Sequence, residues 1–159
     1  NNEYRTELLD EKQGSAFAFN GLDEQIKPDG PECLEMDIDF GSTTAKFVYD
    51  EQTNSYLKQI NGINQIDAVT DIQLAFTNVF VLETDITIRT EYGHKQIDWN
   101  GGDESVGYYF SNGAVQKISW KKTKESDYLK FYDENGKELL INRGKSYIAF
   151  NYENQVDFQ

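Results

Sequence analysis

Residues 107–120 read GYYFSNGAVQKISW, and this stretch decides the fold. Two runs rich in aromatic and aliphatic residues flank the pair Asn112-Gly113. A two-residue hairpin turn needs a positive φ at both central residues, and Asn-Gly adopts that conformation at the least steric cost. The stretch therefore predicts two antiparallel strands joined by a type I′ turn.

Four further Asn-Gly pairs punctuate the chain, beginning at Asn20, Asn61, Asn100 and Asn135. Several of them lie between runs rich in Tyr, Phe, Ile and Val, which suit pleated, half-buried surfaces. The pattern predicts an all-β fold, either an antiparallel sandwich or a partly open barrel built from hairpins, and it leaves both open. The expected strands cover residues 15–19, 34–40, 45–49, 56–60, 63–66, 76–82, 86–90, 94–99, 107–110, 114–120, 128–132, 138–141 and 146–151.

Two of these strands differ in their hydrophobic pattern. Residues 34–40 alternate strictly, with Leu, Met, Ile and Phe on one side and acidic residues on the other, which indicates a half-buried strand. Residues 76–82 are almost continuously apolar, which indicates a central strand covered on both faces. Residues 152–159 read as a polar tail.

The chain of 159 residues is expected to hold one folded domain. Residues 1–14 are polar, and we expect a short N-terminal helix or a linker. Residues 15–159 are expected to form the single β domain. Because the chain opens with Asn1-Asn2 and no Met, we expect it to be a piece of a longer precursor.

The formal net charge of −13 argues against nucleic acid and anionic lipid as partners. A local group of lysines, at positions 117, 121, 122 and 124, is followed at once by Glu125 and Asp127 and is predicted to be the solvated face of a strand and turn. No apolar run is long enough for a membrane span or a signal peptide.

The sequence holds one cysteine, Cys33, and one histidine, His94. Any scheme with a Cys or Ser nucleophile would have to use that histidine, and no nucleophile elbow is present. We predict a buried thiol and a surface imidazole instead. Two such ligands are too few for zinc, and no cofactor is expected.

A loop rich in glycine and acidic residues, 100–105, offers the best local hint of a binding site. An aromatic ring beside a carboxylate suits the face of a sugar, and the candidate binding residues are Asp98, Trp99, Asp103, Glu104 and Tyr108. A weak cation site on the same carboxylates and simple aromatic packing across strands are the alternatives. Trp120 is expected in the core.

Four ordered segments resemble one family: FVYDEQTNSYLKQINGINQID (47–67), NVFVLET (78–84), GYYFSNGAVQKISWKK (107–122) and FYDENGKELLINRGKSYIAF (131–150). They are similar to the C-terminal domain of the YerB-like bacterial lipoproteins. Departures occur at Lys58, Arg143 and Tyr147, where that family usually has Arg, Pro and Trp. The matching positions are Tyr49, Asp50, Tyr56, Asn61, Gly62, Asp67, Asn78, Val79, Val81, Gly107, Tyr108, Phe110, Gly113, Trp120, Lys121, Asp133, Gly136, Lys137, Glu138, Gly144, Lys145 and Ile148.

The resemblance implies a place outside the cytoplasmic membrane, with membrane contact only through a lipid anchor absent from this chain. It also implies a separate N-terminal domain in the full-length protein, of which residues 1–14 would be the tail or the connection. It implies no established biochemical activity. Our main hypothesis is a non-catalytic binding or interaction module of the cell envelope. Its partner would be another envelope protein or its own N-terminal domain. The alternatives are a domain that binds or hydrolyses cell-wall polysaccharide, such as peptidoglycan, and a structural spacer for the N-terminal domain.

Overall fold

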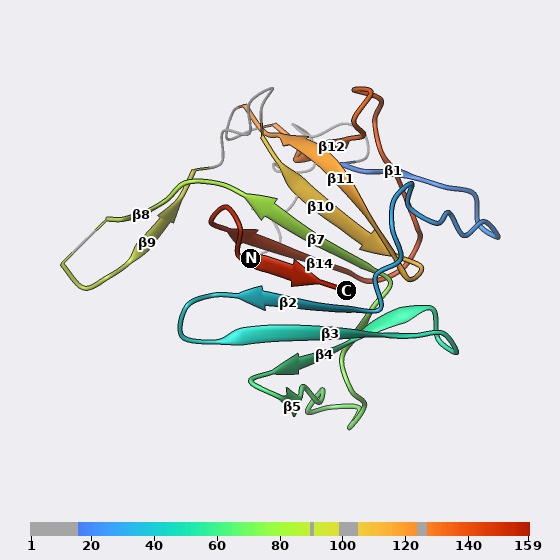
Figure 1. Ribbon diagram of the computed structural model, residues 1–159, viewed down its shortest axis with the longest axis horizontal. Coiled ribbons are helices and arrows are strands. Elements are labelled where there is room, and N and C mark those ends of the chain that lie inside the picture. Colours follow the sequence, from blue (N-terminus) through green and yellow to red (C-terminus); the bar gives the residue numbers. More distant parts are fainter. Residues whose placement is uncertain (1–15, 90, 99–104, 124–126) are drawn as a thin grey trace, which may run out of the picture.

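The computed structural model describes residues 16–89, 91–98, 105–123 and 127–159. These residues form strands and no helix, which confirms the predicted all-β fold. Two sheets pack against each other as a sandwich, and neither closes into a barrel (Figure 1). The predicted helix or linker at residues 1–14 lies outside the described residues.

The first sheet has five strands, in which β7 lies between β10 and β14. Consecutive strands β10 and β11 form the hairpin predicted around Asn112-Gly113. Both of these turn residues have a positive φ, 48° and 68°, as a type I′ turn requires. In spatial order the strands are β12 (Lys130–Tyr132), β11 (Ala114–Lys121), β10 (Gly107–Ser111), β7 (Asn78–Glu83) and β14 (Ser146–Asn151).

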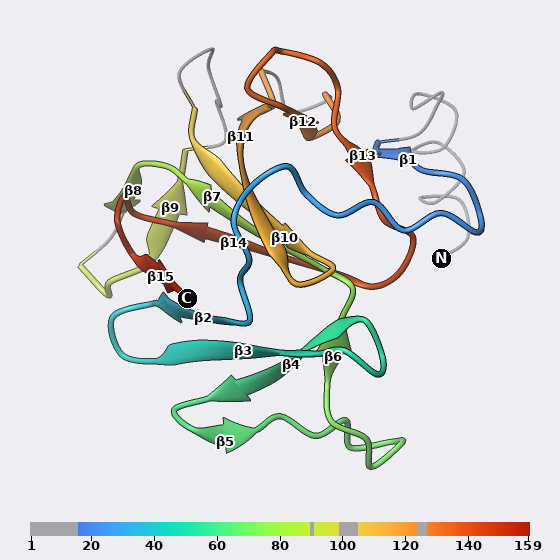
Figure 2. The ribbon, with the colours of Figure 1, turned by 45° about the vertical axis from the view of Figure 1, so that its right-hand side comes forward.

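The second sheet is built mainly from the first half of the chain, and the last residues of the chain form one of its edge strands (Figure 2). The Asn61-Gly62 turn joins its last two strands and again has positive φ at both positions, 49° and 78°. In order the strands are β15 (Val156–Phe158), β2 (Glu35–Asp39), β3 (Thr44–Asp50), β4 (Ser55–Ile60) and β5 (Ile63–Asn64), with β6 (Ala75–Phe76) also paired to β4.

Two smaller pairs complete the structure. β8 (Ile86–Ile88) and β9 (Lys95–Ile97) form a two-stranded arm that projects from one end of the sandwich (Figures 1 and 2). β1 (Ala18–Phe19) and β13 (Leu140–Ile141) pair beside the first sheet.

Apolar side chains fill two cores, one on each face of the first sheet. Met36, Ile38 and Phe47 of the second sheet pack against Val79 and Phe110 of the first sheet. The opposite face of the first sheet buries a second group around stacked aromatic rings, which comprises Phe80, Leu82, Tyr109, Ile118, Trp120, Phe131, Leu139 and Ile141. β7 is therefore covered on both faces, as predicted from its continuous apolar run.

A buried polar cluster ties the long N-terminal loop to the first sheet. The Asn142 amide donates to Ser111 Oγ at 2.9 Å and to the Ile26 carbonyl oxygen at 2.7 Å. Its own oxygen accepts from the Ile26 N–H at 2.8 Å and from the Asn20 amide at 2.7 Å. Because both Asn142 and Asn20 are buried, these bonds satisfy groups that water cannot reach.

The structure corrects two sequence-based expectations. β14 pairs with β7 in parallel, as β1 does with β13, so the sheets are not purely antiparallel. The tail contains a further strand, β15, which pairs with β2. The pair Asn20-Gly21 lies in the long N-terminal loop and makes no hairpin turn, and Asn20 is buried in the polar cluster.

Candidate functional site

The described residues of the predicted sugar site lie on different elements. Asp98 is exposed at the base of the arm, where its N–H donates to the Asp85 carbonyl oxygen at 2.9 Å. Tyr108 lies in β10, half-buried, with its ring 5.7 Å from that of Phe158. The other three predicted residues, Trp99, Asp103 and Glu104, fall outside the described residues, so this site stays a prediction.

The environment of Tyr108 keeps its hydroxyl protonated. Partial burial raises the pKa of this phenol, and the negative charges of Glu83 and Glu153 raise it further. Tyr108 can therefore donate a hydrogen bond to a ligand at any ordinary pH.

Cys33 and His94 give no sign of a catalytic pair. Cys33 is fully buried, and burial raises its pKa to about 11, which disfavours the reactive thiolate. His94 is exposed near the tip of the arm, next to Tyr92. In the described ranges, no group of three or more His, Cys, Asp or Glu side chains could hold a metal ion.

The clearest exposed apolar feature is the loop from β4 to β6, residues 60–74, here called the aliphatic loop. It presents four aliphatic side chains to solvent: Ile63 (69% exposed), Ile66 (48%), Val69 (93%) and Ile72 (66%). Apolar side chains exposed singly are ordinary, but four within one short loop mark a surface that another molecule can cover.

Asp67 gives the aliphatic loop a defined shape. One of its carboxylate oxygens accepts the N–H groups of Val69 and Thr70, each at 2.9 Å. Its backbone N–H donates to the Ile72 carbonyl oxygen at 2.9 Å, which closes the loop. These bonds favour the ionised form and lower the pKa of Asp67. The exposed side chains are thus held in place by the backbone beneath them.

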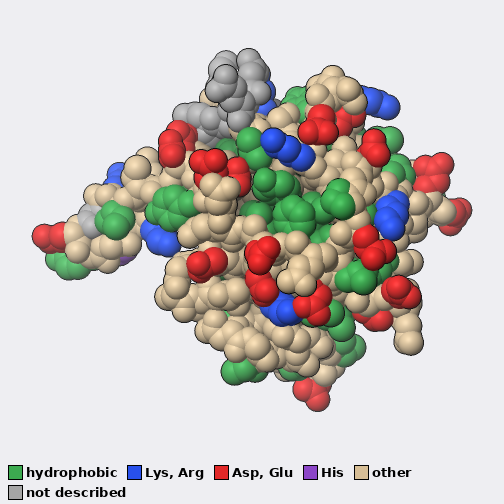
Figure 3. Space-filling model, in the orientation of Figure 1, with side chains coloured by type: hydrophobic (Ala, Val, Ile, Leu, Met, Phe, Trp, Pro, Cys, Tyr) green, Lys and Arg blue, Asp and Glu red, His purple; other side chains and the backbone are tan. Residues whose placement is uncertain are grey.

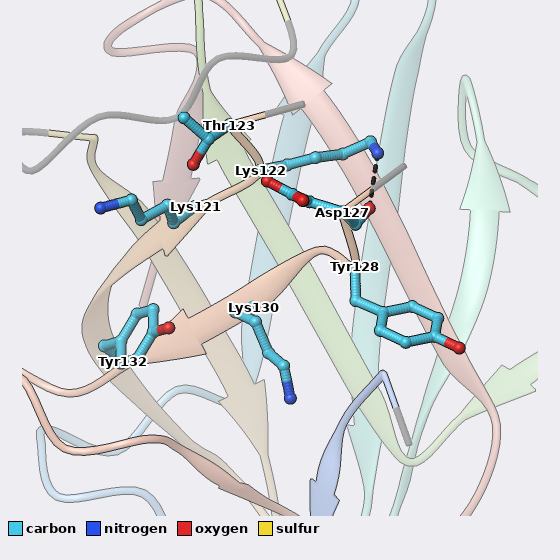
Figure 4. Close-up of a pocket in the computed structure, with 7 residues that line it drawn as sticks. All are labelled: Lys121, Lys122, Thr123, Asp127, Tyr128, Lys130 and Tyr132. Carbon is cyan, nitrogen blue, oxygen red and sulfur yellow. Dashed lines mark hydrogen bonds between the residues drawn. The ribbon is translucent and has the colours of Figure 1, made fainter. Parts of the chain in front are cut away.

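A hollow of about 320 Å³ lies on the outer face of the hairpin formed by β11 and β12 (Figure 4). Its walls carry three lysines and two tyrosines together with one acidic side chain. The lining residues are Lys121, Lys122, Thr123, Asp127, Tyr128, Lys130 and Tyr132.

Strand register explains why these side chains share a face. Lys121 and Lys130 are direct partners across the antiparallel pair, and Trp120 pairs with Phe131 on the buried side. Because side chains alternate along a strand, Tyr132 points to the same side as Lys130. The apolar partners anchor the hairpin in the core and leave the lysines outside.

The lysines of the hollow have polar partners. Lys130 Nζ lies 2.6 Å from a carboxylate oxygen of Glu138, and both side chains are partly exposed. Lys122 Nζ donates to the Asp127 carbonyl oxygen at 2.7 Å and so ties the two ends of the connection between the strands. Figure 4 shows the Tyr132 hydroxyl directed toward Lys130, with Tyr128 on the other side.

Sequence reasoning located half of this hollow and gave it no role. Lys121 and Lys122 belong to the lysine group that was predicted to be a solvated face. Lys130 and the two tyrosines come from the next strand, so only the register of β11 on β12 brings them to the lysines. The alternation of Tyr128, Lys130 and Tyr132 was the available signal.

In the described ranges, no helix is long and apolar enough to cross a membrane. The family described as "Protein of unknown function (DUF3048) C-terminal domain" matches residues 36–148. Over 95 residues the chain is 25% identical to the YerB protein of Bacillus subtilis (strain 168), which is named as a candidate lipoprotein. That match covers 57% of this chain and 28% of the relative.

The crystal structure of the YerB protein from Bacillus subtilis has the same fold, with a TM-score of 0.71 and 21% sequence identity. The superposition covers 86% of this chain and 47% of that chain. The present chain thus spans less than half of the YerB polypeptide seen in that crystal structure.

Proposed function

Since this chain belongs to the family of DUF3048 C-terminal domains, we propose that it is a non-catalytic interaction module of an extracytoplasmic lipoprotein. Its partner is the N-terminal region of a YerB-like polypeptide, which docks on the aliphatic loop. The name of the relative supports the location, and the exposure and geometry of the loop support the docking surface.

The observation that carries this proposal is the combination of exposure and order in the aliphatic loop. Val69, at 93% exposed, is held by the turn that Asp67 organises. Burying one such side chain completely stabilises a complex by about 1.5–3 kcal/mol, and a preformed loop loses little entropy on docking. A domain that served only as a spacer would not need this surface.

The length of the relatives favours a partner within the same polypeptide. More than half of the YerB chain in the crystal structure lies outside the shared fold. Domains of one chain meet at high effective concentration, so a modest apolar contact is enough to hold them together. A lipid surface is disfavoured, because Asp67 and Asp71 flank Val69 and the chain carries a net charge of −13.

The wider surface fits a protein partner as well. Figure 3 shows apolar side chains gathered near the middle of one face, with acidic side chains spread around them. An apolar centre with a charged rim is the usual anatomy of a protein interface. The complementary surface would carry basic residues at its rim.

The test is a titration of this chain with the separately produced N-terminal region of the full-length protein, followed by calorimetry. Val69→Asp and Ile72→Asp should each weaken binding by at least about tenfold, since a buried carboxylate would have no partner. Leu22→Asp is the matched control, because Leu22 is 81% exposed in a different loop and the substitution adds the same charge.

Hydrogen exchange on the same complex locates the contact. Amides of residues 60–74 should gain protection when the N-terminal region is added. Binding that is unchanged in Val69→Asp, or protection confined to other segments, would remove the aliphatic loop as the docking surface.

A further inference from the structure

β14 forms one edge of the first sheet, beside β7 (Figures 1 and 2). Among the described residues, no strand pairs with its outer side. The Lys145 carbonyl oxygen accepts from the first residue of β7 at 3.1 Å, and the parallel register then assigns the backbone groups of Tyr147 and Ala149 to β7. Alternate residues of a strand direct their backbone groups to opposite sides. The N–H and C=O groups of Ser146 and Ile148 therefore point outward, and no described turn or loop bonds to them.

β14 differs from the other edge strands of the two sheets in length and in charge. β12 and β15 have three residues each and β5 has two, and β12 and β15 also carry Lys130 and Asp157. Short strands and charged side chains are two of the means by which proteins protect a sheet edge from pairing. β14 has six residues, SYIAFN, without a charge or a proline. Of the four edge strands that the structure describes, it alone lacks both protections.

An edge of this kind accepts an added strand. Its outward N–H and C=O groups supply main-chain hydrogen bonds, and the side chains beside them supply apolar contacts, as in recognition by strand addition. Left uncovered, the same edge promotes aggregation. A segment that covers β14 in the full-length protein would account for the lack of protection.

The outer side of β14 lies on the same flank of the sandwich as the aliphatic loop. In the interior, the Tyr147 ring of β14 lies 5.4 Å from the ring of Phe76 in β6, the strand that follows the loop. On the opposite flank, the Phe110 ring of β10 lies 5.5 Å from that of Phe158 in β15. The two sheets are therefore aligned, so that β14 faces β4 and β6 while β10 faces β15.

Lys58 links the aliphatic loop to β14. Its carbonyl oxygen accepts from the Gln65 N–H in the loop at 3.1 Å, and its ammonium group lies 4.8 Å from the centre of the Tyr147 ring. Hydrogen bonds within the loop lower the pKa of Asp67, and the positive charge of Lys145 lowers it further, so the start of β14 lies near the loop. A molecule that covers the loop can reach the edge of β14.

We propose that an extended segment of the N-terminal region of the full-length polypeptide adds a strand to the outer side of β14. This inference rests on the proposed docking of that region and specifies how the region is held. The backbone of the added strand bonds to Ser146 and Ile148. Its side chains extend the core between the sheets next to Tyr147, and the second core next to Ile148. Such a segment is apolar on both faces and contains no proline at the bonded positions.

A segment of the same polypeptide suits this edge better than a second copy of the chain. Each copy carries a net charge of −13, which opposes self-association. More than half of the YerB chain in the crystal structure lies outside the shared fold, which leaves ample length for one further strand. A segment tethered to the domain also binds at a high effective concentration.

The experiment is hydrogen exchange, resolved by residue with NMR, on the present chain and on the full-length polypeptide. In the present chain, the amides of Tyr147 and Ala149 should be protected by β7, and those of Ser146 and Ile148 should exchange rapidly. In the full-length polypeptide, Ser146 and Ile148 should gain at least about tenfold in protection, with little change at Tyr147 and Ala149. This alternation is specific to strand addition, because a contact that only covers the surface does not follow the backbone period of two.

Proline and alanine at one position separate the backbone from the side chain. Ser146→Pro removes an outward N–H and leaves the bonds to β7 in place, so the gain in protection at Ile148 should disappear. Ser146→Ala keeps the amide and should retain the gain. Ile88→Pro is a second control, because Ile88 is 70% exposed and lies in the arm. A circular dichroism spectrum of each variant ensures that folded proteins are compared.

The outcomes distinguish this inference from the docking proposal. Protection of residues 60–74 without a gain at Ser146 and Ile148 would overturn strand addition and leave the aliphatic loop as the docking surface. The reverse result would support strand addition and remove the loop. A gain at neither place would overturn both. Protection of Ser146 and Ile148 that rises with the concentration of the present chain alone would assign the edge to a second copy and overturn the proposal.

Discussion

The ammonium group of Lys58 lies 4.8 Å from the centre of the Tyr147 ring, and these are two of the three positions that depart from the family pattern. Relatives usually place Arg and Trp there. The resemblance thus sets a cation and an aromatic side chain at the same two positions, the residue types that form the contact seen here. Lys58 is partly buried, and the loss of hydration on burial lowers its pKa. The contact with the ring replaces part of the hydration that the ammonium group has lost.

A double-mutant cycle with Lys58→Met and Tyr147→Leu should show a coupling of about 0.5–2 kcal/mol in the free energy of unfolding. The double variant Lys58→Arg with Tyr147→Trp should likewise be more stable than the sum of the single changes. Urea unfolding measures both. Strict additivity in each pair would show that the two side chains are only neighbours.

Gly113→Ala should destabilise the protein more than Gly62→Ala does. Both glycines have a positive φ, 68° and 78°, so each alanine meets backbone strain of about 1–2 kcal/mol. A Cβ on Gly113 would also lie 2.9 Å from Tyr49 Cε1, whereas a Cβ on Gly62 meets nothing within 4 Å. Overpacking adds about 1–3 kcal/mol. Equal losses in urea unfolding would contradict this account of Gly113.

Asn142→Ala should cost several kcal/mol, since each buried partner left without a hydrogen bond costs about 1–3 kcal/mol. The affected groups belong to Ser111, Asn20 and the backbone of Ile26. Asn135→Ala in an exposed turn is the control and should be nearly neutral. Thermal unfolding compares them, and hydrogen exchange should show the loop around residue 26 opening first.

Cys33 should make stability fall at alkaline pH. The folded state raises the pKa of its thiol from 9.0 to about 11, so the folded state keeps the proton after the unfolded chain has lost it. The free energy of unfolding should fall between these pH values, by up to about 1.4 kcal/mol per pH unit. Cys33→Ala should show a shallower decline across that window. Identical slopes in wild type and variant would rule the thiol out.

If the predicted sugar surface exists, the wild-type chain should co-sediment with insoluble peptidoglycan. Trp99→Ala combined with Tyr108→Ala should abolish this binding, because stacking area and a hydroxyl donor are both lost. Tyr152→Ala is the control, since Tyr152 is 39% exposed and lies on a different turn. A wild-type chain that stays in the supernatant would end this hypothesis.

Sequence reasoning predicted the local structure correctly where a few neighbouring residues determine it. Asn61-Gly62 and Asn112-Gly113 make the expected hairpin turns, and at Asn135-Gly136 only the glycine has a positive φ, as expected for a type I turn with a glycine bulge. Asn20-Gly21 makes no hairpin turn, and the buried Asn20 amide bonds instead to a distant residue, Asn142. Such partners cannot be read from neighbouring residues.

Long-range pairing was the part that sequence reasoning missed. β14 and β7 are far apart in the chain and run in parallel, so no turn connects them or sets their register. β15 has only Val156 and Phe158 as apolar residues, a pattern too short to identify a strand. The hollow was missed for a different reason, because it depends on the register of two consecutive strands, which pairs Lys121 with Lys130.

The position of the last two strands governs when this protein can fold. β14 completes the first sheet beside β7, and β15 completes the second beside β2. The first sheet therefore lacks a strand until synthesis has reached residue 151, and the second sheet lacks one until residue 158. Both pairings join segments that are far apart in the chain, which slows folding. A nascent chain stopped at residue 145 would expose an open edge on each sheet, where proteases and chaperones would find it.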